Sequence, residues 1–83
     1  MGKTKRIKFS KPIDSDSGKT QVWDVLDSDG DTLGQVRWFG RWRRYSFYPS
    51  PFTVYEKDCL REVANFCERE SYLLRQKWWR IKH

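Results

Sequence analysis

The strongest constraint on the fold is an aromatic and arginine-rich stretch, residues 32–49, which reads TLGQVRWFGRWRRYSFYP. Two alternating runs, residues 33–39 and 42–48, flank Gly40 and Arg41, and a glycine at the first loop position is typical of a two-residue type II′ turn. The pattern therefore predicts a β-hairpin. The cross-strand pairs that this turn predicts on one face are Phe39/Trp42, Arg37/Arg44, Gln35/Ser46 and Leu33/Tyr48.

The two faces of the predicted hairpin differ in chemistry. One face carries Val36, Trp38, Tyr45 and Phe47, with Arg43 near the turn, and we expect it to be buried. The other face carries polar and basic residues between aromatic ends, which is typical of a contact surface. The candidate residues for binding nucleic acid or a protein partner are Gln35, Arg37, Phe39, Arg41, Trp42, Arg44, Ser46 and Tyr48.

Arg37 and Arg44 are predicted to lie directly opposite one another on this second face. Like charges that face each other destabilise an antiparallel pair, so the pairing favours an anion, such as a phosphate or a carboxylate, held between the two guanidinium groups. The alternative is that both side chains extend into water or pair with Asp24 on the neighbouring strand.

Charged residues are segregated along the chain, whose formal net charge is +6. Residues 1–11 hold five basic groups and no acid, residues 12–36 hold six aspartates and one lysine, and residues 37–44 hold four arginines and no acid. This segregation favours an anionic partner, although charge runs also serve simply as solvated surface. It also predicts an acidic end of the sheet at residues 28–30 and a basic end at Arg41.

The sequence lacks the residues that several classes of function require. No apolar run approaches the length of about 18 residues that spans a bilayer, and the N-terminus has no secretory hydrophobic region, so we expect a cytoplasmic protein without a membrane span. The single histidine is His83, which leaves no Cys/His zinc set and no Ser/His/Asp triad away from the chain end. Cys59 and Cys67 are eight residues apart in a predicted helix, too far for a disulfide. We expect no metal, no cofactor and no enzymatic activity.

A helix is predicted after the hairpin. Thr53 and Glu56 form a capping box, and apolar or small residues then recur at spacings of four and three. These positions are Leu60, Ala64, Cys67, Ser71, Leu74, Trp78 and Ile81. With a further strand over residues 20–27, the prediction is an α+β fold: a three- or four-stranded antiparallel sheet, a β-meander, packed on one C-terminal helix. Residues 1–19 are expected to be a basic arm and a mobile loop, and residues 20–70 the core domain.

Residues 71–83 are expected to be a basic amphipathic extension, because the helix is longer than a sheet whose strands have about seven residues. Four arrangements are open for it: a dimerisation helix, a segment lying on a membrane surface, a nucleic-acid contact, or packing back on its own domain. The coiled-coil-like spacing favours self-association through Leu74, Trp78 and Ile81, which would give a homodimer.

Four motifs in the middle of the chain carry a resemblance. They are WDVL at residues 23–26, GQVRWF at 34–39, WRRYSFYP at 42–49 and TVYEKDCLREVANF at 53–66. The pattern resembles small uncharacterised proteins carried by bacteriophages and prophages, written as WRxYxFxP and TV[FY]…CLxx[IV]AxF. The resemblance covers a little over half of the chain and implies a phage context, hence the host cytoplasm, without naming an activity. Three strands followed by a helix are also similar in architecture to plant ethylene-response and integrase arm-binding domains, which read DNA with the sheet.

Two function hypotheses follow. In the first, Arg37 and Arg44 contact phosphates or guanine edges, Gln35 offers its amide to a base, and the aromatic residues stack on exposed bases of a nucleic acid. In the second, the same surface belongs to a phage-encoded inhibitor that binds a host protein or an anionic nucleotide signal. The motifs also leave a third arrangement open, in which Trp42 and Tyr48 are buried and the arginines are merely solvated.

Overall fold

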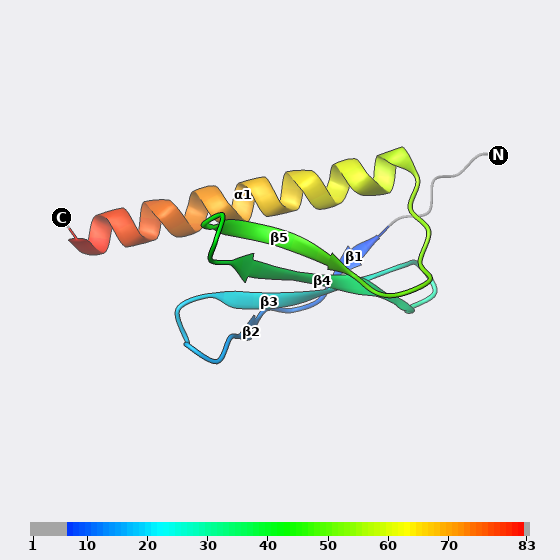
Figure 1. Ribbon diagram of the computed structural model, residues 1–83, viewed down its shortest axis with the longest axis horizontal. Helices are drawn as coiled ribbons and strands as arrows, with labels where there is room; N and C mark the ends of the chain where they lie inside the picture. The colour runs from blue at the N-terminus through cyan, green and yellow to red at the C-terminus, as the bar shows by residue number, and fades with distance from the viewer. Residues whose placement is uncertain (1–6, 83) are drawn as a thin grey trace.

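A computed structural model describes the backbone of residues 7–82 and the side chains of residues 7–79. One antiparallel sheet is covered on one face by one long helix (Figure 1). The elements are β1 Lys8–Phe9, β2 Ile13–Asp14, β3 Gln21–Leu26, β4 Thr32–Phe39, β5 Arg44–Pro49 and α1 Lys57–Lys82. The predicted α+β class is confirmed. The sheet has five strands, because the segment before residue 20 adds two short ones.

The N-terminal segment forms one edge of the sheet. The strand order is β1-β3-β4-β5, and β2 pairs with the beginning of β3 while β1 pairs with its end. Between β1 and β2, Ser10 keeps the segment attached: its N–H donates to the Asp24 carbonyl at 2.9 Å, and its Oγ accepts the Asp24 N–H at 2.8 Å. Residues 7–14 therefore belong to the folded sheet, where the sequence predicted an arm and a loop.

The register of the β4–β5 hairpin differs from the prediction by two residues. The loop is residues 40–43, in which the Trp42 and Arg43 N–H groups donate to the carbonyls of Phe39 and Gly40 and Arg43 has a φ of 53°. The observed pairs are Phe39/Arg44, Trp38/Tyr45, Arg37/Ser46, Val36/Phe47, Gln35/Tyr48 and Gly34/Pro49. The predicted two-residue turn and the direct Arg37/Arg44 pair are wrong. A shift of two residues keeps every paired side chain on its predicted face, because strand side chains alternate with a period of two.

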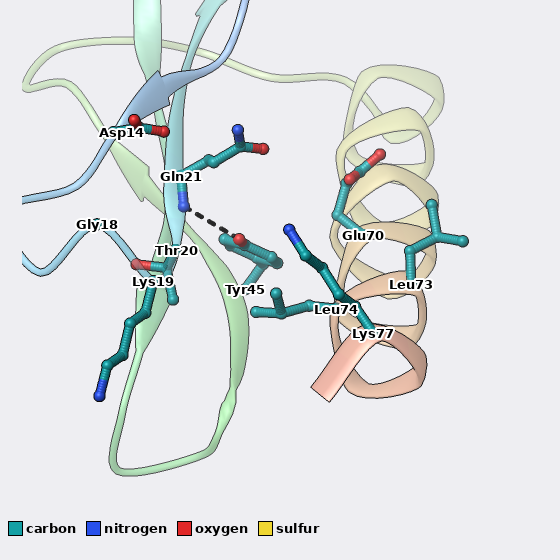
Figure 2. Close-up of a pocket in the computed structure, with 10 residues that line it drawn as sticks. All are labelled: Asp14, Gly18, Lys19, Thr20, Gln21, Tyr45, Glu70, Leu73, Leu74 and Lys77. Carbon is teal, nitrogen blue, oxygen red and sulfur yellow. Dashed lines mark hydrogen bonds between the residues drawn. The ribbon is translucent and has the colours of Figure 1, made fainter. Parts of the chain in front are cut away.

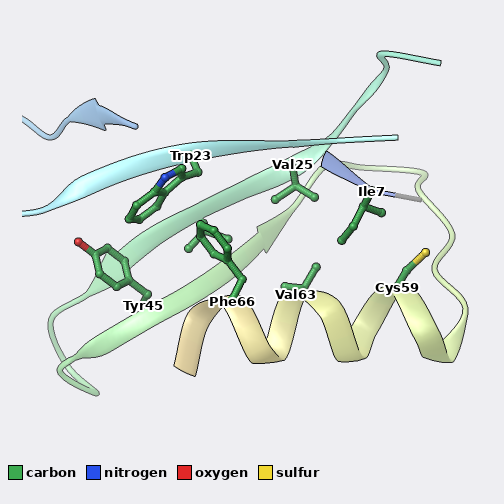
Figure 3. Close-up of a cluster of buried hydrophobic side chains, with 8 residues drawn as sticks. Ile7, Trp23, Val25, Tyr45, Cys59, Val63 and Phe66 are labelled. Atoms are coloured by element: carbon green, nitrogen blue, oxygen red, sulfur yellow. The ribbon is translucent and has the colours of Figure 1, made fainter. Parts of the chain in front are cut away.

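Aromatic and aliphatic side chains together form the core between the sheet and α1 (Figure 3). Phe9 stacks on Phe66 with 3.9 Å between ring centroids, and Trp23 meets Tyr45 and Phe66 edge to face at 5.1 and 5.0 Å. The buried cluster is Ile7, Trp23, Val25, Val36, Tyr45, Cys59, Val63 and Phe66. Large rings bury more surface per residue than aliphatic side chains, which lets a chain of 83 residues form a core.

The helix begins three residues later than the spacing of Thr53 and Glu56 predicted. Glu56 itself caps it, since its Oε1 accepts the Cys59 N–H at 2.7 Å and its carbonyl accepts the Leu60 N–H at 3.1 Å. The Thr53 hydroxyl instead donates to the Ser50 carbonyl at 2.8 Å. Residues 53–56 before the helix are irregular, and Phe52 adopts a left-handed conformation with a φ of 62°.

The C-terminal half of α1 also packs on the sheet. Ser71 Oγ donates to the Cys67 carbonyl at 2.7 Å and accepts the Tyr45 N–H of β5 at 2.8 Å, and the helix continues without a break. Further along, the Trp78 ring meets Trp38 edge to face at 5.3 Å. In the first half the buried positions are Cys59, Val63 and Phe66, whereas the predicted stripe positions Leu60 and Ala64 are exposed.

Candidate functional site

The outer face of the sheet is the face turned away from α1 (Figure 1). Gln35, Arg37 and Phe39 of β4 and Ser46 and Tyr48 of β5 alternate with core residues, so they lie on this outer face. The chain thus assembles most of the predicted contact residues on one surface. Leu33, which the predicted register placed opposite Tyr48, packs against the core.

Four of these side chains form a connected group, which we call the aromatic–arginine cluster: Arg37, Phe39, Trp42 and Tyr48. The Phe39 ring meets Trp42 at 4.7 Å and Tyr48 at 6.5 Å between centroids, both edge to face. The Arg37 guanidinium carbon lies 5.3 Å from the centre of the Tyr48 ring. Trp42 is 61% exposed and Tyr48 is 37% exposed. The exposed rings are therefore held in place by their neighbours while they remain accessible to a ligand.

The arginines at the hairpin end have no acidic partner among the described residues. Within residues 7–79, Arg37, Arg41 and Arg44 form no ion pair with a carboxylate, and all three are exposed. Arg44 Nε donates to the Trp42 carbonyl at 3.3 Å, which fixes its guanidinium beside the loop. The hairpin end therefore presents positive charge that an anion could neutralise.

The middle of the outer face is different in charge. Gln35 Nε2 donates a hydrogen bond to Asp24 Oδ1 at 3.0 Å. The Gln35 amide, which we expected to contact a base, is therefore bonded within the protein. The Asp24 carboxylate also adds a negative charge to the outer face, and it pairs with Gln35 and not with an arginine. The part of the outer face suited to an anion is therefore confined to the hairpin end.

The two turns at opposite ends of the sheet carry opposite charges. The acidic turn at residues 27–31 connects β3 to β4 at one end of the sheet, and Arg41 and Arg43 occupy the hairpin loop at the other. The C-terminal half of α1 lies beside this loop (Figure 1), which brings Arg75 and Lys77 to the same end. Acidic residues lie at this end as well, namely Asp14 of β2 and Glu70 of α1, so the positive charge is concentrated at the hairpin loop and does not cover the whole end.

Two of the three residues predicted for self-association contact their own sheet. Leu74 is partly buried against the core and Trp78 packs on Trp38, while the side chain of Ile81 lies outside the described residues. The large apolar side chains that are exposed in this half are Tyr72, Leu73 and Trp79. Leu74 and Trp78 therefore keep only part of their surface accessible.

A pocket of about 210 Å³ lies between the start of β3 and α1 (Figure 2). The Tyr45 hydroxyl accepts the Gln21 N–H there at 3.1 Å, and Lys19, Lys77 and Glu70 are among the lining residues. Burial raises the pKa of Tyr45, the Gln21 N–H opposes this, and the negative charge of Glu70 adds to it. The pocket combines both signs of charge, so its lining does not select an anion or a cation.

Neither cysteine is activated as a nucleophile. Burial raises the pKa of Cys67 to about 11, and burial together with the neighbouring Glu56 raises the pKa of Cys59. A raised pKa keeps a thiol protonated near neutral pH, and the thiolate is the reactive form. Across the described residues there is also no group of three or more His, Cys, Asp or Glu that could hold a metal ion.

The helix α1 is long, yet no helix in the described part of the chain is apolar enough over its length to cross a membrane.

No protein-family model matches the chain, and no solved structure matches it. A 49-residue stretch is 35% identical to an uncharacterised 9.3 kDa protein of Acholeplasma phage L2. That stretch is 58% of this chain and covers 63% of the phage protein. The chain is therefore similar to a small phage protein over more than half of its length.

Proposed function

We propose that this protein binds nucleic acid through the hairpin end of its outer face, as a binding protein without catalytic chemistry. The observation that carries the proposal is the aromatic–arginine cluster. It holds the exposed rings of Trp42 and Tyr48 beside the exposed guanidinium of Arg37, with no carboxylate paired to that arginine among the described residues.

Each part of the cluster has a role in this binding. Bases stack on the Trp42 and Tyr48 rings, and such stacking contributes about 1–3 kcal/mol per base whatever the sequence. Phosphates accept hydrogen bonds from Arg37, Arg41 and Arg44. Phe39 does not need to touch the ligand, because its edge contacts keep the two exposed rings in position.

The charge on the molecule orients the ligand. The acidic turn at residues 27–31 and the Asp24 carboxylate repel phosphates from the middle and far end of the outer face. The arginines attract them to the hairpin end. The bound segment therefore extends toward the loop and α1, and does not run along the whole sheet.

The experiment is a titration of fluorescein-labelled single-stranded and duplex DNA followed by anisotropy at two salt concentrations. A binder that contacts several phosphates loses affinity steeply as salt rises, because bound counterions are released. We expect Trp42→Ala to weaken binding about fivefold or more, the value of one lost stacking contact. The control is Arg61→Gln, at the opposite end of α1, which should bind like the parent.

Binding to a host protein, as a phage-encoded inhibitor, is the second candidate. The observation that favours it is the composition of the cluster, since Trp, Tyr and Arg are the residues enriched in protein-interface hot spots. If neither DNA nor RNA binds, host lysate should be passed over immobilised parent, Trp42→Ala and Arg61→Gln proteins. A partner retained by the parent and by Arg61→Gln, but lost with Trp42→Ala, would support this candidate. An anionic nucleotide signal would suit the same arginines and can be titrated directly.

A further inference from the structure

A groove of about 570 Å³ lies where the free edge of β5 meets the middle of α1. Its lining includes Arg44, Tyr45, Glu68, Ser71, Tyr72 and Arg75. We call it the β5–α1 groove. Arg44, at one end of the groove, donates its Nε–H to the backbone carbonyl of Trp42, the loop residue whose ring belongs to the aromatic–arginine cluster.

Two guanidinium groups at the groove each donate a hydrogen bond to the backbone of the hairpin loop. Arg44 is held by the Trp42 carbonyl at 3.3 Å, and Arg75 Nη2 donates to the Arg43 carbonyl at 3.2 Å. An arginine has five N–H donors, so each keeps several for a ligand. Opposing them, the described lining holds one carboxylate, that of Glu68. Two positioned guanidinium groups favour a phosphate.

The groove also presents an aromatic ring. Tyr72 is 59% exposed and precedes Arg75 by three residues, so ring and guanidinium are neighbours on the helix surface. The groove thus repeats the chemistry of the outer face, where Arg37 accompanies exposed rings. A base can stack on Tyr72 while its phosphate meets Arg75.

A peptide strand does not suit this edge of the sheet. The Tyr45 N–H of β5 already donates to Ser71 Oγ at 2.8 Å, and Pro49 on the same side of the strand has no N–H. A peptide added to a sheet edge depends on those backbone donors. The positive charge and the exposed ring therefore leave nucleic acid as the occupant that the groove fits.

We propose that the β5–α1 groove is a second subsite for one single strand of nucleic acid. The strand stacks on Trp42, turns round the edge of β5, places a phosphate between Arg44 and Arg75, and stacks a base on Tyr72. This inference rests on the proposed function and narrows it to single strands, because a duplex with a persistence length of about 50 nm does not bend round the edge of one β-strand.

The test uses fluorescein-labelled oligothymidylates of about 4 and about 12 nucleotides, a range that brackets single-strand site sizes. Tyr72→Ala should weaken binding of the longer strand about fivefold or more and change the shorter one less than about twofold, since only the longer strand reaches both subsites. Tyr72→Phe keeps the ring and should bind like the parent. Leu73→Ala, at an adjacent exposed position, is the matched control.

A second variant reads the phosphate contact. Arg75→Gln should lower the magnitude of the slope of log affinity against log salt by about 0.7, the share of one phosphate on a single strand, while Arg61→Gln leaves it unchanged. Thermal melting checks that each variant is folded. The groove subsite is overturned if Tyr72→Ala and Arg75→Gln bind the longer strand like the parent, or if Tyr72→Ala weakens both strands equally. If Tyr72→Ala and Arg75→Gln bind the longer strand like the parent while Trp42→Ala binds it more weakly, the proposed function stands without the groove subsite. If the parent protein binds no nucleic acid, both the proposed function and the groove subsite fail.

Discussion

Arg37 contributes both a positive charge and a contact with an aromatic ring to the proposed site. It is exposed, and its guanidinium lies over the Tyr48 ring. Such an exposed cation–π contact contributes about 0.5–1 kcal/mol, so Arg37→Gln should remain folded and lower the free energy of unfolding by no more than about 1 kcal/mol. We expect it to weaken nucleic-acid binding about fivefold to tenfold, by loss of a charge-assisted phosphate contact. Anisotropy and thermal melting measure the two effects.

The matched comparison for Arg37 is Arg61, another exposed arginine, which pairs with Asp58 at 3.5 Å. Arg61→Gln should change neither property. Unfolding of Arg37→Gln, or affinity equal to that of the parent, would mean that the outer face is not the site.

The sequence predicted the sheet face of each hairpin residue better than its cross-strand partner. Alternation alone placed Arg37, Ser46 and Tyr48 on the outer face, and this is correct because face depends only on odd or even position along the strand. The partner of each residue depends on loop length. Here Trp42 leaves the strand to contact Phe39, and Arg43 adopts a left-handed conformation, which no hydrophobic pattern records. The predicted anion site between directly paired Arg37 and Arg44 is therefore absent from the observed register.

At the scale of elements, Ser71 joins α1 to the edge of the sheet. It is buried and accepts the Tyr45 N–H, so Ser71→Ala leaves a buried backbone donor without its partner. We expect a loss of about 1–3 kcal/mol in the free energy of unfolding, measured by urea denaturation. Asn65→Ala, at an exposed position of the same helix, should change it by less than about 0.5 kcal/mol. Equal stabilities for the two variants would show that the bond does not anchor the helix.

The helix shows how far periodicity can be trusted. A spacing of four and three residues predicted a helix and its continuation past Ser71, and Leu74 and Trp78 do face the sheet. The same stripe failed at Leu60, because the contact line moves round the helix along its length. The β5–α1 groove could not be predicted either, since it exists only through the placement of α1 beside β5. Self-association of the extension stays a prediction, although two of its proposed residues, Leu74 and Trp78, pack against the sheet of their own chain.

At the scale of the whole molecule, the acidic turn at residues 27–31 and the arginine-rich loop at residues 40–43 lie at opposite ends of the sheet, because successive turns of a meander alternate between its ends. The separation does not cover the whole acidic run, since Asp14 pairs with Gln21 at the hairpin-loop end. The sequence could not show that α1 would bring Arg75 to the basic end, where it donates to the Arg43 carbonyl of the hairpin loop.

This separation leads to a last prediction, about the Asp24 carboxylate in the middle of the outer face. Asp24→Asn removes a negative charge near the aromatic–arginine cluster and keeps an oxygen that can accept the Gln35 amide hydrogen bond. We expect nucleic acid to bind about twofold to fivefold more tightly, the effect of one exposed charge, and the gain to shrink as salt rises. Asp29→Asn changes the same charge in the distant acidic turn, where screening should leave affinity unchanged. Equal gains for the two variants in anisotropy titrations would mean that only net charge matters and that the ligand has no fixed place on the outer face.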